Sequence, residues 1–257
     1  MLRGIDIPLD ILFHTAAYFR DSFKGGRHWE TLYKVNVKGT ENLLAAAYEA
    51  GIPRVVHTSS VGVLTAPAGV LIDETMDRPE TGADDYFRSK ILADRKVYDF
   101  LAGHPDMESV MVLPGWMVGP GDIGPTSSGQ MVLDFVNRKL PGIVPATFSV
   151  VDARDVAVCQ IAAAERGRTG ERYIAAGRAM TMAGLFSLLE KVTGVPAPSR
   201  RIPMWLLFGL AACNRRTGLN RPRNGPPDCS RSRSDTIQPS NWRGGIGTKG
   251  DQSTRLG

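Results

Sequence analysis

Short apolar strands alternate with helical segments through the first 213 residues, and this alternation constrains the fold more than any other feature of the sequence. Residues 10–14, 54–58 and 109–113 are short runs with aliphatic or β-branched centres, as expected of strands buried on both faces of a sheet. Helical patterns lie between them, at residues 29–50 and at about 86–101. This order predicts a parallel α/β sheet that helices cover on both faces.

Turn and capping residues bound these elements. Gly51 and Pro53 stop the first helix, and Asp84 or Asp85 can cap the second. The later part of the chain predicts the following elements: a helix capped by Ser127 or Ser128 and reaching about residue 140, a strand at 148–151, a helix ending at about 165, a strand at 172–175, and a helix that Thr181 opens and that reaches about 193.

The basic charge of the sequence is concentrated in its tail. The chain has a formal net charge of +5, but residues 214–257 contain nine Lys or Arg against three Asp, so residues 1–213 carry −1. The tail is rich in Gly, Pro, Ser and Arg and has almost no aliphatic periodicity, which predicts disorder. Nucleic-acid binding by this tail is the alternative, but Trp242 is its single aromatic residue and no known binding module is recognisable, so no nucleic-acid partner is predicted.

Cysteines and apolar segments favour a cytoplasmic protein. Cys159, Cys213 and Cys229 are odd in number and widely spaced, so neither a disulfide framework nor a metal site is predicted. The first ten residues lack the profile of a signal peptide. The longest apolar run, residues 202–213, is shorter than the roughly 20 residues of a spanning helix, so no integral membrane segment is predicted. The run predicts a buried or docked helix, with peripheral membrane contact as the alternative.

Tyr86 and Lys90 are the first candidates for chemistry. At positions i and i+4 of a helix their side chains share one face. A neighbouring ammonium stabilises phenolate, and we expect it to lower the pKa of Tyr86 and make this residue a general acid or base. The pattern also fits an ordinary exposed helical pair.

Ser60 gives the pair a context. It follows the strand at residues 54–58, and ligands bind at the carboxyl ends of strands in open parallel sheets. Its hydroxyl could therefore hydrogen-bond a substrate oxygen while Tyr86 transfers a proton. Local turn hydrogen bonding by Ser59 and Ser60 is the alternative interpretation.

Six short motifs follow one another over roughly residues 8–210: 14–17 (H/D-x-A-A), 36–44 (N-V-x-G-T-x-N-L-L), 56–60 (a serine motif that ends a strand), 86–90 (Y-x-x-x-K), 113–122 (R-P-x-x-V-Y-G-P-G-D, with Leu and Val replacing two usual residues) and 150–157 (V-H-V-x-D-V-A). In this order they resemble the extended short-chain dehydrogenase/reductase superfamily, also called the NAD-dependent epimerase/dehydratase family. Within it the chain is most similar to the dihydroflavonol-4-reductase-like and hopanoid-associated sugar-epimerase-like branch.

The resemblance implies a fold and a set of roles. The fold would be an NAD(P)-binding Rossmann-type doubly wound parallel sheet lacking its first strands, with a small C-terminal substrate domain. Residues 1–120 would form the partial Rossmann domain with the catalytic residues, 121–213 the substrate-binding region interleaved with late Rossmann elements, and 214–257 the basic disordered tail. Ser60, Tyr86 and Lys90 would be catalytic. NAD or NADP would contact Thr15, Ala16, Ala17, Asn36, Thr58, Lys90, Pro114 and Val118, although Asn36 could equally be a structural hydrogen-bonding residue.

The same resemblance implies oxidoreductase or epimerase chemistry at the CH–OH/C=O group of a small molecule, such as a nucleotide-sugar or a dihydroflavonol-like ketone, by a chain that could form a homodimer. The family's glycine-rich phosphate-binding turn is not found before His14, so we expect this chain alone to bind nicotinamide cofactors very weakly. Micromolar binding in a fluorescence titration with NADH or NADPH would contradict that expectation. The alternative function is a non-catalytic fragment or interaction protein that keeps the family fold.

Overall fold

A four-stranded parallel sheet forms the centre of the computed structural model, which describes residues 8–19, 28–67, 70–123 and 126–203. Its strands lie side by side in the order β1 (Ile11–His14), β2 (Arg54–Thr58), β3 (Glu108–Pro114) and β6 (Arg172–Ala175). Every neighbouring pair is parallel, so all four carboxyl ends lie at one edge of the sheet. The predicted parallel α/β sheet is confirmed.

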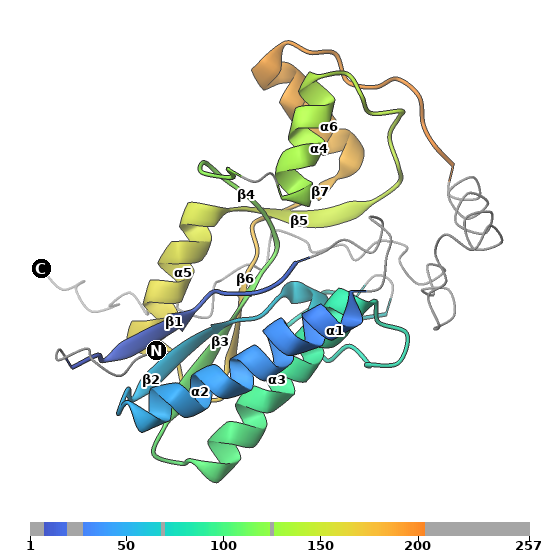
Figure 1. The fold of residues 1–257 in the computed structure, drawn as a ribbon. Coiled ribbons are helices and arrows are strands. Elements are labelled where there is room, and N and C mark those ends of the chain that lie inside the picture. Colours follow the sequence, from blue (N-terminus) through green and yellow to red (C-terminus); the bar gives the residue numbers. More distant parts are fainter. Residues whose placement is uncertain (1–7, 20–27, 68–69, 124–125, 204–257) are drawn as a thin grey trace, which may run out of the picture.

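Helices cover both faces of this sheet (Figure 1). One layer consists of α1 (Trp29–Leu32), η2 (Tyr33–Lys38), α2 (Gly39–Glu49) and α3 (Asp85–Gly103), and α5 (Ala153–Arg166) lies on the opposite face. Side chains alternate between the two layers, because successive residues of a strand point to opposite faces. Val55 of β2 belongs to the core cluster that contains α2 and α3 residues, whereas Val56 belongs to the cluster that contains α5 residues.

The predicted boundaries of the helices nearest the site hold. The helix from Trp29 to Glu49 is continuous but contains a π-helical stretch, η2, that no sequence pattern indicated. It ends before Gly51, whose φ of 69° is in the left-handed region that glycine tolerates. Asp84 caps α3, and its carboxylate accepts a hydrogen bond from the backbone N–H of Phe87.

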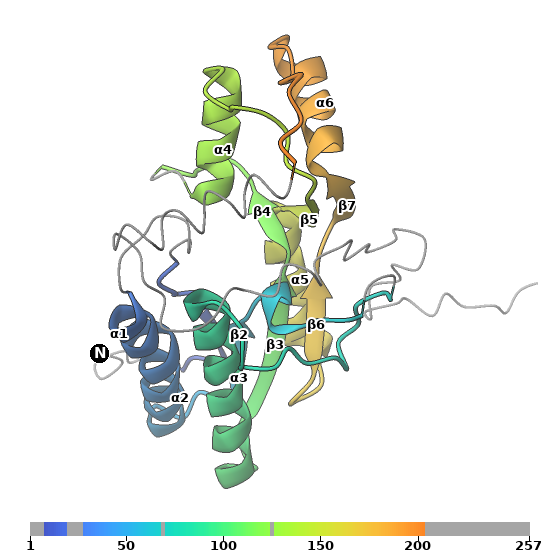
Figure 2. The same ribbon diagram turned by 90° about the vertical axis from the view of Figure 1, so that its right-hand side faces the viewer.

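A second, smaller sheet lies beyond the carboxyl end of β3 (Figure 2). It contains β4 (Trp116–Val118), β5 (Thr147–Asp152) and β7 (Arg178–Thr181), with α4 (Ser127–Val136) and α6 (Met182–Thr193) packed through a small core of Phe135, Leu185 and Phe186. The sequence pattern missed β4 and β7, because strands of three and four residues are too short to show a periodicity. The predicted opening of α6 at Thr181 is confirmed.

The prediction for α4 was wrong at both ends. Thr126, not Ser127 or Ser128, caps this helix, and its side chain accepts from the N–H of Gly129. The helix ends at Val136 rather than near residue 140, because the amide of Asn137 donates to Leu133 O and Arg138 takes a φ of 57°.

The predicted division into domains at residues 120 and 213 stays a prediction. The basic tail and most of the apolar run at 202–213 lie outside the described residues. Within the described ranges no helix is both long enough and apolar enough to cross a membrane.

Candidate functional site

Most of the predicted site residues follow the carboxyl ends of neighbouring strands. Thr15, Ala16 and Ala17 come directly after β1 and are exposed, which leaves the backbone there open to a ligand. Thr58 is the last residue of β2 and Ser60 follows it. Pro114 ends β3 and is buried, and Val118 ends β4 and is half-buried. Both side chains are apolar and form no hydrogen bonds.

Tyr86 lies in the first turn of α3 and is largely buried. Its ring contacts the ring of Phe19 edge-on, with 4.7 Å between centroids. Burial, followed by the negative charges of Asp84 and Asp94, raises the pKa of Tyr86 to about 12. The expectation that Lys90 lowers this pKa is therefore wrong for the chain without a ligand.

Lys90 is buried beside the end of β2. It is only 3% exposed, and its ammonium donates a 2.7 Å hydrogen bond to the carbonyl oxygen of Thr58. Lys90 thus reaches the carboxyl end of β2, and its charge is not among the causes that shift the pKa of Tyr86. Burial lowers the pKa of Lys90 itself, and the negative charge of Asp94 opposes that shift.

Ser60 performs the local turn role and keeps its proton available. Its Oγ accepts a 3.1 Å hydrogen bond from the N–H of Gly62 and caps the short 3-10 helix η3 (Val61–Val63). A hydroxyl that accepts in this way can still donate its own hydrogen to a ligand. The turn interpretation is therefore correct for Ser60 and wrong for Ser59, whose hydroxyl donates to Asp94 instead. The turn role of Ser60 does not exclude the proposed catalytic role.

The turn that carries Ser60 is fixed against α3. A Cβ on Gly62 would lie 2.0 Å from the ring of Phe87, so only glycine allows this close approach to the residue next to Tyr86. Arg78 closes the contact from the other side. Its guanidinium donates to the carbonyls of Gly62 and Leu64 and lies 5.4 Å from the Phe87 ring centroid.

Asn36 holds the segment after β1 to helix α3, which carries Tyr86 and Lys90. Its Oδ1 accepts from the N–H of Tyr18 at 2.7 Å, and its Nδ2 donates to Tyr18 O and to Ser89 Oγ, each at 2.9 Å. Ser89 in turn donates to the carbonyl oxygen of Tyr86. Asn36 therefore has the structural hydrogen-bonding role that the sequence left open, and it acts on both the cofactor-side segment and the helix of Tyr86.

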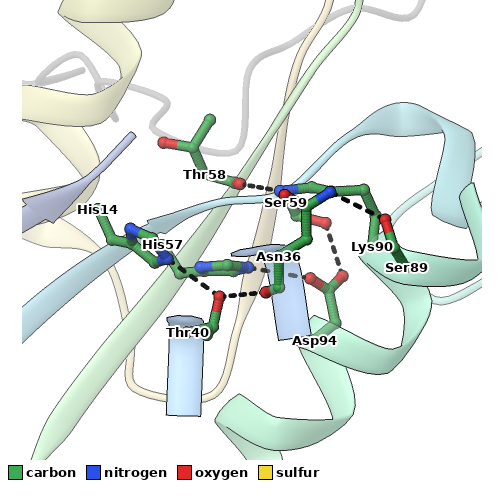
Figure 3. Close-up of polar contacts among 9 residues, drawn as sticks. All are labelled: His14, Asn36, Thr40, His57, Thr58, Ser59, Ser89, Lys90 and Asp94. Atoms are coloured by element: carbon green, nitrogen blue, oxygen red, sulfur yellow. Dashed lines mark hydrogen bonds and ion pairs between the residues drawn. The ribbon is translucent and has the colours of Figure 1, made fainter. Parts of the chain in front are cut away.

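A buried polar cluster behind Lys90 was not predicted (Figure 3). Both oxygens of the Asp94 carboxylate are used, because Ser59 Oγ donates to Oδ2 at 2.6 Å and His57 Nε2 contacts Oδ1 at 3.2 Å. His14 Nε2 contacts Thr40 Oγ1 at 3.0 Å, and the two histidine rings lie 5.3 Å apart. Burial lowers the pKa of His14 to about 3 and also lowers that of His57.

The cluster has the residue types of a serine hydrolase but not the geometry. Ser59 and His57 both hydrogen-bond the same carboxylate, whereas a nucleophilic triad requires the histidine to lie between serine and aspartate. The side chains of Ser59, His57 and Asp94 are also all buried. The arrangement therefore does not supply a nucleophile. In the described ranges no group of three or more His, Cys, Asp or Glu residues could hold a metal ion.

The fold is a Rossmann-type fold of the short-chain dehydrogenase class. Two features define it: the parallel sheet has small and hydroxyl residues at its carboxyl edge, and the helix that follows bears Tyr86 and Lys90. The model of the 3-beta hydroxysteroid dehydrogenase/isomerase family matches residues 5–124. The crystal structure of gox2253 superimposes with a TM-score of 0.75 and 34% identity, over 87% of this chain and 67% of that one. The chain belongs to the extended short-chain dehydrogenase/reductase superfamily, as its motifs indicated.

Two curated relatives agree with this assignment. A putative dihydroflavonol 4-reductase of Synechocystis sp. is 37% identical over 206 residues, and sterol demethylase protein B of Methylococcus capsulatus is 36% identical over 201 residues. Each alignment covers 78% of this chain, and the chain spans 59% and 60% of the lengths of these relatives.

A more distant structure confirms the fold alone. The dTDP-glucose 4,6-dehydratase DesIV of Streptomyces venezuelae, with NAD and DAU bound, is 22% identical with a TM-score of 0.65, over 79% of this chain and 62% of that one. The predicted Rossmann-type class is therefore correct.

Proposed function

We propose that this chain carries the catalytic, nicotinamide-side part of an NAD(P)-dependent oxidoreductase or epimerase that acts on the CH–OH/C=O group of a small molecule. The observation that carries the proposal is the position of Lys90, whose buried ammonium meets the carboxyl end of β2 one helical turn after Tyr86. Relatives named as a reductase and as a sterol demethylase protein, and the dehydratase with NAD bound, support the same chemistry.

The residues fit the nicotinamide end of such a cofactor. Within the described chain the Lys90 ammonium uses one of its three hydrogens, on Thr58 O, which leaves two for ribose hydroxyls. The small exposed side chains of Thr15, Ala16 and Ala17 leave the backbone after β1 accessible. We propose that these residues, with Asn36 behind them and Pro114 and Val118 at the ends of the next strands, hold the nicotinamide riboside. When bound, the nicotinamide would accept or supply a hydride.

The protein side of the reaction would be a proton transfer. Because the pKa of Tyr86 is raised to about 12, its hydroxyl is protonated at neutral pH and can donate to a developing alkoxide of the substrate. The free hydrogen of Ser60 would donate to the same oxygen and orient it. Dehydration and epimerisation begin with the reverse step, oxidation of a CH–OH group, in which the substrate hydroxyl would give its proton to Tyr86 as phenolate. The raised pKa of Tyr86 therefore favours the reduction direction in the chain without a cofactor.

Replacing Tyr86 by phenylalanine tests the proposal. We expect the rate of NAD(P)-dependent turnover, measured at 340 nm with a panel of alcohols and ketones at millimolar cofactor, to fall by about 100-fold or more, because the proton donor is lost. Tyr98→Phe is the matched control, since Tyr98 is an exposed tyrosine on the same helix. Equal rates for the wild type and Tyr86→Phe would contradict the assignment.

Finer features remain part of the proposal. The substrate is a nucleotide-sugar or a dihydroflavonol-like ketone, the chain acts as a homodimer, and its compartment is the cytoplasm. The odd, widely spaced cysteines support a reducing compartment. Sedimentation of the full chain would test the dimer.

A further inference from the structure

Asp94 lies on α3, one helical turn after Lys90 and two turns after Tyr86, so the three residues share one face of the helix. Its carboxylate is in the protein interior, with the residue 5% exposed. An isolated buried carboxylate is costly, so a chain that keeps one needs groups that stabilise it. Asp94 is not among the residues that the family motifs identified, and its place behind the site requires an explanation.

Hydrogen bonds stabilise the carboxylate on both of its oxygens. Ser59 donates to Oδ2, and His57 lies within hydrogen-bond distance of Oδ1. Since burial lowers the pKa of His57, its ring is neutral, and Nε2 carries the hydrogen that Asp94 accepts. Both donors are neutral, so the negative charge of Asp94 is still without a compensating charge within these contacts.

Lys90 carries a buried positive charge that its hydrogen bond does not compensate. Its buried ammonium donates to one neutral acceptor, Thr58 O, which satisfies a hydrogen but not the charge. The titratable side chains that interact electrostatically with it come from three elements: His14 from β1, His57 from β2 and Asp94 from α3, while Tyr86 lies one turn earlier on the same helix. His14, His57 and Tyr86 are neutral at pH 7. Of the described carboxylates, Asp94 is the one whose charge acts on Lys90.

We propose that Asp94 is a positioning residue, whose buried carboxylate keeps the Lys90 ammonium charged and seated at the carboxyl end of β2 while it anchors Ser59 beneath the Ser60 turn. This inference rests on the proposed function for the use that it assigns to Lys90, but the charge pairing itself is a property of the chain without any cofactor. Asp94 would touch neither substrate nor cofactor and would act through Lys90 and Ser59.

The direct test measures the protonation of Lys90 in the full chain without cofactor. Lysine labelled with ¹³C at Cε gives a resonance whose shift reports the ammonium, and Lys90→Met identifies the signal. Asp94→Asn keeps the shape and removes the charge, and it retains one of the two acceptor oxygens; we expect it to lower the pKa of Lys90 by about one unit or more. Asp94→Glu should restore most of that shift, because it restores the charge. Asp99→Asn is the matched control, since Asp99 is exposed on the same helix.

The stability of Asp94→Asn in two backgrounds gives a second test. If Asp94 compensates Lys90, the stability loss of Asp94→Asn should be smaller when residue 90 is already methionine, because no buried cation is then left unpaired. If Asp94→Asn alone does not fold, the same pairing predicts that Lys90→Met restores folding to it. An unchanged Lys90 pKa in Asp94→Asn, or an equal loss of stability in both backgrounds, would overturn the proposal and leave Asp94 with a purely structural role. Neither measurement uses turnover, so failure of the proposed enzyme activity would not be mistaken for failure of this inference.

Discussion

Replacing Asn36 by alanine is expected to destabilise the protein by about 3 kcal/mol, because one buried hydrogen bond to Ser89 and two part-buried ones to Tyr18 are lost and their partners are left unsatisfied. Asn36 is 2% exposed, so water cannot take over these bonds without entering the interior. The loss should also separate the segment at Tyr18 from α3, because no described side chain other than Asn36 hydrogen-bonds both Tyr18 and Ser89.

Urea unfolding of the full chain measures this effect. Asn137→Ala is the control, because the exposed amide of Asn137 donates a single hydrogen bond to Leu133 O, and its removal should cost under about 1 kcal/mol. A loss for Asn36→Ala no larger than that of the control would show that Asn36 does not connect the two segments. Hydrogen exchange at Tyr18 N–H should increase in Asn36→Ala alone.

Acidification below pH 6.5 is expected to destabilise the protein through its buried histidines. Burial lowers the pKa of His14 to about 3, so the unfolded chain binds a proton that the folded chain excludes throughout the window between about 3 and 6.5. Stability is complete above 6.5 and falls as the pH drops, by about 2 kcal/mol from His14 alone between pH 6.5 and 5. His57, whose pKa burial also lowers, adds to the loss in the same direction.

Thermal or urea unfolding as a function of pH checks the sign and the source. His14→Gln keeps a hydrogen-bond donor for Thr40 and cannot be protonated. The loss of stability between pH 6.5 and 5 should therefore be smaller in this variant. His104→Gln, at the far end of α3 beside Phe100, should show the same loss of stability between pH 6.5 and 5 as the wild type. Stability that is constant or rises between pH 6.5 and 5 in the wild type would contradict the buried neutral state of His14.

The sequence predicted the central sheet because its strands are apolar at their centres and punctuated by caps. The run 54–58 coincides with β2, and Gly51 and Asp84 mark the helix ends as expected. The second sheet could not be predicted in the same way. β4 and β7 are defined by their pairing with β5, a long-range contact that leaves no local pattern in strands this short.

The candidate site, like the fold, could be predicted from the sequence only in part. Spacing alone puts Tyr86 and Lys90 on one helical face, and the order of strand and turn places Ser60 at the carboxyl edge. The direction of the Tyr86 pKa could not be predicted, because it depends on where the Lys90 ammonium points and on how deeply Tyr86 is buried. The position of Asp94 four residues after Lys90 was a signal available in the sequence. Its partners Ser59 and His57 become apparent only when β2 packs against α3.

Gly62 has a packing role that its place in the sequence does not reveal. A sequence shows a glycine after a serine pair, which fits many turns. The structure shows that its missing side chain makes room for the ring of Phe87, so the Ser60 turn and the Tyr86 helix are in direct contact. The relative position of two proposed catalytic residues therefore depends on packing that local propensity does not describe.

Binding of nicotinamide mononucleotide to the ¹⁵N-labelled full chain tests the central claim most directly, because this probe contains the nicotinamide riboside but lacks the adenylate half of the cofactor. The account predicts amide shift changes at millimolar ligand that are confined to Thr15, Ala16, Ala17, Asn36, Thr58, Val118 and the first turns of α3, and that are lost in Lys90→Met. An absence of shift changes in the wild type, or changes that are unaffected by Lys90→Met, would contradict the proposal that these residues form a nicotinamide site.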